Sequence, residues 1–262
     1  MEIPIEERRL KRFDDFLKLY EASRRMVVLT GAGISTLSGI PDFRSSDGLY
    51  SKDYGQLPVE ELVSIGFFRN HPDIFYSWAE EYWYHIEDFK PNLIHKVLKK
   101  LEDNGKLTDG IFTQNIDFLH ERAGSKKVYN LHGTLERGFC MDCRSFMTYE
   151  KMAEIVRAGM VPRCQQCGGV IKPDIVFYDD CLDGSLLDRA SSSFSYSDLV
   201  LVLGSSLIVN PAASLPYLAA RAGHDIVIVN RDPTYLDEYA ALKFDDLEEF
   251  FTAFDRYLTE NT

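Results

Sequence analysis

The most constraining feature of the sequence is a short apolar run that ends in a pair of glycines. Met26-Val-Val-Leu-Thr30 is almost entirely apolar, and Gly31-Ala32-Gly33 follows it directly. A run without polar alternation is typical of a strand that is buried on both faces of a sheet. Such a strand, followed by a glycine turn and a helix, begins many nucleotide-binding βαβ units. We therefore expect a parallel sheet with a ligand site at the end of this strand.

Further apolar runs have the same length, and helical patterns lie between several of them. The predicted strands are Met26–Thr30, Ile111–Thr113, Val128–Leu131, Leu199–Leu203 and Ile226–Val229, and the predicted helices are residues 6–22, Leu93–Leu101, Ala212–Ala222 and Leu247–Leu258. Buried strands that alternate with helices favour an α/β fold, with a parallel sheet covered on both faces.

Two stretches interrupt this alternation. Residues 45–90 contain no convincing buried strand and predict a loop followed by helices, including an aromatic-rich stretch from Phe75 to Tyr84. Residues 138–170 contain four of the five cysteines. We interpret both stretches as insertions that form a smaller domain beside the sheet.

Four cysteines are arranged in two Cys-x-x-Cys pairs, Cys140/Cys143 and Cys164/Cys167, separated by twenty residues. Four thiolates at this spacing are typical of a tetrahedral structural zinc site with no open position. A redox function would need only one pair. Cys181 stands apart and is interpreted as an ordinary thiol.

The charge balance bears on possible partners. The chain has 41 acidic and 29 basic residues and a formal net charge of −12. This argues against direct binding to nucleic acid, which needs a basic surface. The acidic balance is compatible with a lysine-bearing protein substrate, although solubility alone explains it more simply. The sequence contains no apolar run of membrane-spanning length, and Met1 to Arg12 lack a signal-peptide pattern, so we expect no membrane partner and a cytoplasmic location.

The glycine turn departs from the dinucleotide fingerprint of dehydrogenases. Thr36 stands where that fingerprint has a third small residue, and no strand about 20 residues later ends in a ribose-binding acid. An ordinary dehydrogenase is therefore disfavoured. Asp42, Phe43 and Arg44 follow in a segment rich in Gly and Pro, which predicts either a clamp over a dinucleotide or a simple surface turn.

Polar residues follow the other predicted strands at their carboxyl ends, where parallel sheets bind ligands. These clusters are Gln114-Asn115-Ile116-Asp117, His132-Gly133, Gly204-Ser205-Ser206 and Asn230-Arg231. A histidine at a strand end, beside a glycine, is a candidate general base. Small hydroxyls and free backbone N–H groups suit phosphate and ribose oxygens.

Taken together, these residues resemble the sirtuin (Sir2) family. The matching motifs occur in the family's order and cover residues 30 to 230: Gly31-Ala-Gly-Ile-Ser35, Gly39-Ile-Pro-Asp-Phe-Arg44, Thr113-Gln-Asn-Ile-Asp117, Leu131-His-Gly133, the four cysteines, Gly204-Ser-Ser206 and Asn230. The resemblance implies a Rossmann-like domain (1–44, 91–136 and 172–262) and a small domain of helices and a zinc ribbon (45–90 and 137–171), with the ligand cleft between them.

The resemblance also implies an activity. NAD is consumed as a co-substrate in the removal of acyl groups from lysine side chains of proteins, and the products are nicotinamide, free lysine and 2′-O-acyl-ADP-ribose. It implies that His132, Asn115 and Asp117 are catalytic and that zinc is only structural. The implied NAD-binding residues are Gly31, Ala32, Gly33, Ser35, Thr36, Asp42, Phe43, Arg44, Gln114, Asn115, Ile116, Asp117, Gly204, Ser205, Ser206, Asn230 and Arg231.

The segment expected to bind the acyl-lysine departs from the family's usual Val-x-Phe-Gly-Glu. Here Ile175 is followed by Val176-Phe177-Tyr178, which we expect to bind substrate, and then by Asp179-Asp180 in place of Gly-Glu. Members that remove succinyl or malonyl groups have a Tyr-x-x-Arg pair, whereas this chain has Tyr76-x-x-Ala79. Acetyl or longer neutral acyl groups are therefore the expected substrates.

Two other hypotheses stay open at this point. The first is a different enzyme activity in the same cleft, either ADP-ribosyl transfer to protein or plain NAD hydrolysis. The second is a non-catalytic NAD-binding or zinc-scaffold module, which His132 and Asn115 argue against.

Overall fold

The fold is built on a parallel sheet. The structure is a computed structural model that describes residues 5–42, 48 and 57–261. Within these residues, six strands lie in the order β3-β2-β1-β7-β8-β9. Their bounds are Met26–Thr30 (β1), Ile111–Thr113 (β2), Val128–Asn130 (β3), Leu199–Leu203 (β7), Asp225–Val229 (β8) and Leu242–Phe244 (β9). The chain order reverses between the neighbours β1 and β7, which creates the switch point where such sheets bind ligands.

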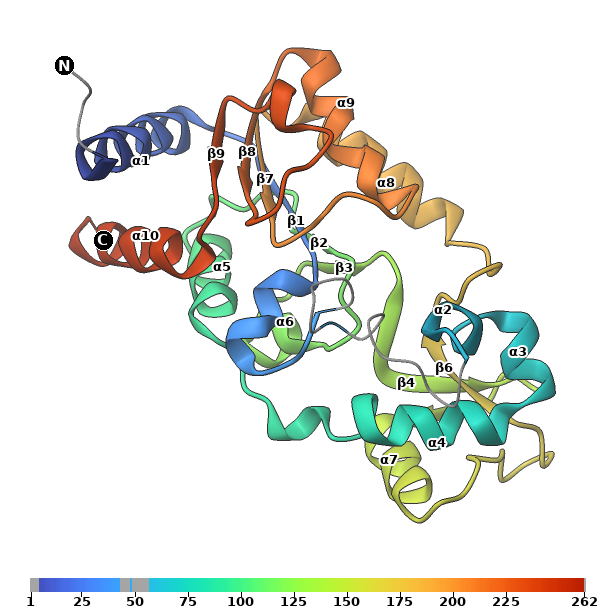
Figure 1. The fold of residues 1–262 in the computed structure, drawn as a ribbon. Helices are drawn as coiled ribbons and strands as arrows, with labels where there is room; N and C mark the ends of the chain where they lie inside the picture. Colours follow the sequence, from blue (N-terminus) through green and yellow to red (C-terminus); the bar gives the residue numbers. More distant parts are fainter. Residues whose placement is uncertain (1–4, 43–47, 49–56, 262) are drawn as a thin grey trace.

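Helices cover both faces of this sheet, as Figure 1 shows. Met26 and Val28 of β1 belong to one apolar cluster, whereas Val27 and Leu29 belong to the other. The helices on the first face are α1 (Ile5–Ala22), α5 (Leu93–Asp103) and α10 (Leu247–Glu260), and those on the second are α8 (Gly184–Tyr196) and α9 (Leu215–Ala222). Successive side chains of a strand point to opposite faces, so burial on both sides explains the uninterrupted apolar runs.

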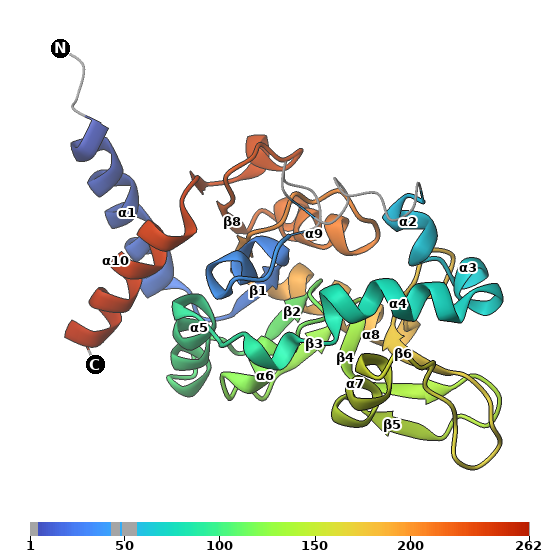
Figure 2. The same ribbon diagram turned by 60° about the horizontal axis from the view of Figure 1, so that its bottom comes forward.

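A second, smaller sheet is antiparallel and has the order β5-β4-β6. Figure 2 shows it beneath the helices that precede it in the chain. The elements of this part are α2 (Val59–Leu62), α3 (Ile65–Asn70), α4 (Pro72–Trp83), β4 (Gly133–Cys140), β5 (Phe146–Thr148), α7 (Tyr149–Arg157) and β6 (Ile171–Ile175). The described residues also form short helices, which are η1 (Ala32–Ser38), η3 (Ile86–Asp88), α6 (Leu119–Arg122), η4 (Ala212–Ser214) and η5 (Asp237–Tyr239).

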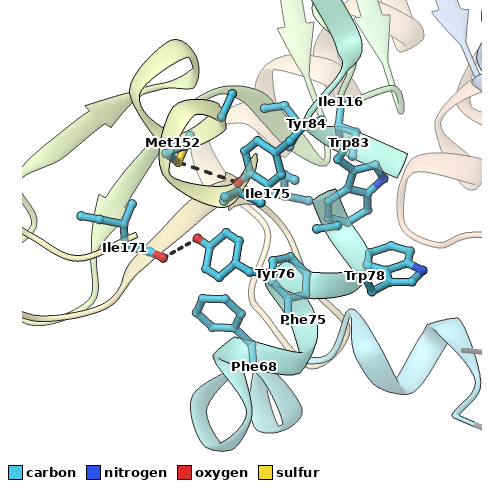
Figure 3. Close-up of a cluster of buried hydrophobic side chains, with 14 of the residues drawn as sticks. Phe68, Phe75, Tyr76, Trp78, Trp83, Tyr84, Ile116, Met152, Ile171 and Ile175 are labelled. Carbon is cyan, nitrogen blue, oxygen red and sulfur yellow. Dashed lines mark hydrogen bonds between the residues drawn. The ribbon is translucent and has the colours of Figure 1, made fainter. Parts of the chain in front are cut away.

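Aromatic side chains form the core between α4 and the small sheet (Figure 3). The Phe75 ring lies edge-on to Phe68, with ring centroids 5.0 Å apart. Tyr76 is buried, and its hydroxyl donates a hydrogen bond to the carbonyl oxygen of Ile171 in β6 (2.6 Å). The hydrogen bond fixes α4 on the sheet, since a buried tyrosine hydroxyl requires a partner.

The five predicted strands and the predicted α/β class are confirmed, but several elements were not expected, among them β9, α8 and α7. β9 has only three residues and lies at the edge of the sheet, so it lacks a full apolar run. α8 contains Ser191-Ser-Ser193, which weakens its helical pattern, and α7 lies inside the cysteine-containing stretch.

The predicted division into two domains stays a prediction. β4 begins at Gly133 and β6 ends at Ile175, so the small sheet extends a few residues beyond the predicted boundaries at 136–137 and 171–172. In the described part of the chain, every helix is too short or too polar for a membrane span.

Candidate active site

A cleft of about 660 Å³ lies at the carboxyl ends of the parallel strands. Residues that follow β1, β2, β7 and β8 line one part of it, and residues of the small-sheet region line another. The lining includes most of the predicted site: Gly31, Ala32, Gly33, Thr36, Asp42, Gln114, Asn115, Ile116, His132, Val176, Phe177, Tyr178, Gly204, Ser205, Ser206, Asn230 and Arg231. Phe43 and Arg44 fall outside the described residues.

Three glycines allow the turns after β1 and β7 to touch. Gly33 N–H donates a hydrogen bond to the Gly204 carbonyl oxygen (2.9 Å). A Cβ at Gly31 would lie 2.6 Å from that same oxygen, and one at Gly204 would lie 2.5 Å from the Ile34 nitrogen. Gly204 also has φ +59°, a conformation that favours glycine. The two turns therefore present bare backbone to the cleft, which suits close approach of a diphosphate.

Gln114 connects the two strand ends on either side of β1. Its Nε2 donates to Ser205 Oγ (2.8 Å), which also accepts from Leu207 N–H (3.2 Å). On the far side of β7, Asn230 Nδ2 donates to the Asp232 carbonyl oxygen (2.8 Å). Side-chain hydrogen bonds thus fix these polar groups in place around the cleft, which reduces the cost of ordering them around a ligand.

A buried polar group lies behind Asn115. Ser35 Oγ donates to Asp117 Oδ2 (2.6 Å), and Asn115 Nδ2 donates to Ser35 Oγ (3.2 Å). Burial raises the pKa of Asp117, although hydrogen bonds from Ser35 and Leu119 N–H act in the opposite direction. Ser35 and Asp117 do not line the cleft.

The Asn115 side chain is positioned to receive a ligand. It is 4% exposed and lines the cleft, and among the described residues its Oδ1 has no hydrogen-bond partner. A buried acceptor without a partner is costly, so this atom fits a ligand that brings an N–H or O–H donor. The glycine cradle and this acceptor together fit NAD.

His132 follows β3 and enters the cleft from the edge of the parallel sheet. Its Nδ1 lies 3.2 Å from the Gln114 carbonyl oxygen. A carbonyl oxygen only accepts, so Nδ1 holds the proton of the neutral ring and Nε2 is the basic nitrogen. The backbone of His132 is held as well, because its carbonyl oxygen accepts from Val176 N–H (2.9 Å). Gly133, with φ +78°, allows the close contact with Asp174, where a Cβ would clash.

The small-sheet side gives the cleft an apolar wall. It consists of Val63, Trp83, Ile116, Ile175 and Phe177, all nearly buried. Figure 3 draws Trp83 of α4, Ile116 and Ile175 as members of one buried apolar cluster. Sequence reasoning missed Val63, which follows α2, and Trp83 of α4, because apolar residues in or beside a helix look like ordinary core residues. The wall suits an uncharged alkyl or acyl chain.

The segment after β6 joins this wall to the rim. Tyr178 N–H donates to the Val63 carbonyl oxygen (2.9 Å), and Ile65 N–H donates to the Tyr178 carbonyl oxygen (3.1 Å). Asp179 lines the cleft with φ +66°, whereas Asp180 forms an ion pair with Lys172 (3.0 Å). The two acids therefore differ in their environment, and Asp179 is the exposed one.

The start of α10 forms the opposite rim, with Asp245, Asp246, Leu247 and Glu248. Asp246 caps the helix by accepting from Glu249 N–H (2.8 Å). The sequence offered only position in the chain as a reason to place Asp246 and Leu247 near an adenine.

The four cysteines form a separate cluster that does not line the cleft. All four sulfur atoms lie within 4.8 Å of one another, and Cys140 Sγ is 3.4 Å from Cys167 Sγ. Tetrahedral zinc with Zn–S bonds of about 2.3 Å holds its sulfurs roughly 3.8 Å apart. A Cβ at Gly169 would lie 2.8 Å from Cys140 Sγ, so this glycine makes room for the cluster. The donor set fits one structural zinc ion.

Comparisons with known proteins agree with this geometry. The Sir2 family model matches residues 31–211, more than half of the chain. The NAD-dependent protein deacetylase of Thermotoga maritima is 45% identical over 240 residues, which cover 91% of this chain and 95% of that protein.

Two solved structures cover 95% of this chain and 98% of theirs. One is Sir2 with a p53 peptide and NAD⁺ (42% identity, TM-score 0.83). The other is Sir2 with the inhibitor EX-527, 2′-O-acetyl-ADP-ribose and a deacetylated p53 peptide (41% identity, TM-score 0.81). With the parallel sheet, the cleft and the cysteine cluster in place, the chain belongs to the Sir2 family.

Proposed function

We infer that this protein is an NAD-dependent protein-lysine deacylase. Its substrates are acylated lysine side chains of proteins and NAD⁺, and its products are free lysine, nicotinamide and 2′-O-acyl-ADP-ribose. The inference rests on the relatives named for this activity and on the structures that contain peptide, NAD⁺ or acetyl-ADP-ribose.

The observation that supports the chemistry best is the position of His132. Its ring lines the same cleft as the glycine turn, and the contact of Nδ1 with the Gln114 carbonyl oxygen makes Nε2 the basic nitrogen. We propose that the acyl carbonyl oxygen first displaces nicotinamide from C1′ of the ribose, which forms an imidate. Nε2 of His132 then removes the proton of a ribose hydroxyl, and the hydroxyl oxygen attacks the imidate carbon. The lysine amine leaves, and one water molecule is taken up to give 2′-O-acyl-ADP-ribose. An imidazole that is neutral near pH 7 suits the proton removal.

The nicotinamide end of NAD⁺ is proposed to lie near Asn115 and Ile116. Asn115 Oδ1 is available to accept a hydrogen bond there. Asp117 supports the same region from behind through Ser35, which contacts both side chains. Its direct contact with the nicotinamide carboxamide stays a prediction.

The diphosphate and adenosine are proposed to lie along the glycine turn and the ends of β7 and β8. Gly31 and Gly33 offer bare backbone, and Ser205, Ser206 and Asn230 offer polar side chains. Because Gln114 binds Ser205, this half of the cleft is linked to the His132 half.

The acyl-lysine is proposed to enter beside Val176, Phe177 and Tyr178 and to reach the apolar wall that includes Trp83. Tyr76 faces the core rather than the cleft, and its hydroxyl is bound to the backbone of Ile171. Ala79 offers no cation for an acyl carboxylate. These contacts support acetyl or longer neutral acyl groups over succinyl or malonyl groups.

Product analysis tests the function. The protein is incubated with an acetyl-lysine peptide and NAD⁺, and the products are identified by mass spectrometry. We expect deacetylated peptide, nicotinamide and acetyl-ADP-ribose in equal amounts. Nicotinamide with ADP-ribose and an unchanged peptide would indicate NAD hydrolysis instead, and a peptide that gains ADP-ribose would indicate transfer.

The expected cytoplasmic location and the expected lack of nucleic-acid and membrane partners stay predictions.

A further inference from the structure

The segment that carries the glycine turn is fastened from behind by a residue that does not line the cleft. Asn92 lies at the start of α5. Its Nδ2 donates to the Ile34 carbonyl oxygen (2.7 Å) and to Ser38 Oγ (2.9 Å). Both acceptors belong to η1, which contributes Ala32, Gly33, Thr36 and Leu37 to the cleft. One side chain therefore holds η1 at its middle and at its end.

The other end of the same amide caps α5. Asn92 Oδ1 accepts from Ile94 N–H (2.9 Å) and lies 3.0 Å from His95 Nδ1. The opposite orientation of the amide would place its oxygen against the Ile34 carbonyl oxygen, which is repulsive. The oxygen of the Asn92 amide thus caps α5, and its nitrogen donates to η1.

The start of η1 is fastened independently. Thr30, which directly precedes Gly31, has its Oγ1 3.1 Å from Nε2 of the buried His120, whose ring packs against His95 at 4.9 Å between centroids. Ser35 is held by Asp117. Asn92 hydrogen-bonds η1 to α5, and one apolar cluster that includes Ile34, Val97 and Leu98 buries both elements against the parallel sheet.

We propose that Asn92 is a positioning residue for NAD, which sets the geometry of η1 and so of the backbone that approaches the diphosphate. This inference rests on the proposed function. A glycine turn has little intrinsic stiffness, so its binding geometry depends on external contacts. Without the two hydrogen bonds from Asn92 to η1, part of the free energy of NAD binding is used to order η1, so the affinity for NAD falls. The peptide site keeps its shape.

Asn92→Asp separates the two tasks of the side chain. Aspartate caps helices as well as asparagine does, so α5 is retained. The carboxylate cannot donate to the Ile34 carbonyl oxygen and is repelled by it, so the hydrogen bond to the middle of η1 is lost, although the Ser38 hydroxyl can still donate to the carboxylate. We expect the affinity for NAD⁺ alone, measured by titration calorimetry, to fall about fivefold, and the KM for NAD⁺ to rise similarly. The KM for an acetylated peptide is expected to stay within twofold of the wild type.

Two further variants keep the test decisive. Asn92→Ser retains a capping oxygen without the repulsion between the carboxylate and the Ile34 carbonyl oxygen, so it gives the answer if Asn92→Asp is unstable. Asp183→Ala removes the cap of α8, where Asp183 accepts from Ser185 N–H (2.8 Å), and is the control for an ordinary loss of stability. It is expected to lower the melting temperature and to leave NAD affinity within twofold.

The proposal is overturned if both Asn92 variants bind NAD⁺ within twofold of the wild type, or if the peptide KM rises as much as the NAD KM. A wild-type protein that binds NAD⁺ but yields no deacylated peptide would contradict the proposed function instead. In that case the calorimetric comparison still decides the role of Asn92.

Discussion

His132 and Gln114 are joined by a hydrogen bond of 3.2 Å, from Nδ1 of the imidazole to the backbone carbonyl oxygen. The side chain of the same Gln114 binds Ser205 (2.8 Å). The proposed base and the turn after β7 that is proposed to bind phosphate are therefore both held by one residue at the end of β2. A residue at a strand end thus positions polar groups in both halves of the cleft.

Gly31→Ala is expected to damage both stability and NAD binding. The new Cβ would lie 2.6 Å from the Gly204 carbonyl oxygen, so the two turns must separate. Insertion of a methyl group into such a contact costs about 1–3 kcal/mol. Urea unfolding and the KM for NAD⁺ measure the two effects. Gly66→Ala is the control, because nothing lies within 4 Å of its Cβ. Equal behaviour of the two variants would refute the proposed contact.

Cys164→Ser is expected to release the metal and to unfold the small-sheet region. Zinc binding supplies folding free energy where four thiolates meet, and the loss of one thiolate breaks the set. Metal analysis of the purified protein and circular dichroism before and after chelation measure this. Cys181→Ser, at an exposed cysteine outside the cluster, is the control. A folded, fully active and zinc-free Cys164→Ser protein would contradict a structural metal.

Stability is expected to fall in mild acid because of two buried histidines. Burial lowers the pKa of His95 from 6.5 to about 4, and it lowers that of His120 as well. Below pH 6.5 the unfolded chain binds protons on these imidazoles, whereas the folded chain does not. The contribution of the two neutral, buried histidines to the free energy of unfolding is therefore complete above pH 6.5 and is lost as the pH falls toward 4.

His95→Gln isolates this effect. We expect the loss of unfolding free energy between pH 7.5 and pH 5 to be smaller than in the wild type by about 2 kcal/mol. Because the two pH values are compared for the same protein, any change in stability that the substitution causes at every pH cancels. His71→Gln, which replaces an exposed imidazole, is the control. Identical acid sensitivity in wild type and His95→Gln would show that His95 is not a cause of the acid sensitivity.

Asp179→Gly is expected to stabilise the protein by up to about 1 kcal/mol. Asp179 has φ +66°, where a side chain is strained and glycine is not. Asp180→Gly is the contrasting variant, because it removes the ion pair with the half-buried Lys172 and should destabilise. Urea unfolding of both variants checks the order. A less stable Asp179→Gly protein would mean that the aspartate has a favourable contact that outweighs its strain.

The sequence predicted the parts of the cleft that follow apolar strands. Gln114, Asn115, Ser205 and Asn230 are polar residues at the ends of buried runs, and parallel strands bring those ends to one edge. The same logic predicted the strands themselves, since burial on both faces leaves an uninterrupted apolar pattern. The four cysteines were predicted from their spacing alone.

Other residues that form or support the cleft are not marked by any pattern in the sequence. Trp83 lines the cleft from the end of α4, where an aromatic residue is indistinguishable in sequence from the core residues around it. The sequence also could not predict that Ser35 and Asp117 face each other behind Asn115, because side-chain direction is not periodic outside regular strands. Asn92 lies outside every motif, and only its distances to Ile34 and Ser38 indicate its role.

The most direct test of the account is the product pattern of His132→Ala. With an acetylated peptide and NAD⁺, we expect formation of acetyl-ADP-ribose to fall about 10²- to 10⁴-fold, the range typical of a lost general base. NAD⁺ affinity measured by calorimetry should stay within a few fold, because the glycine turn and the Gln114–Ser205 contact remain. Unchanged formation of acetyl-ADP-ribose by the folded variant would contradict the assignment of His132 as the base.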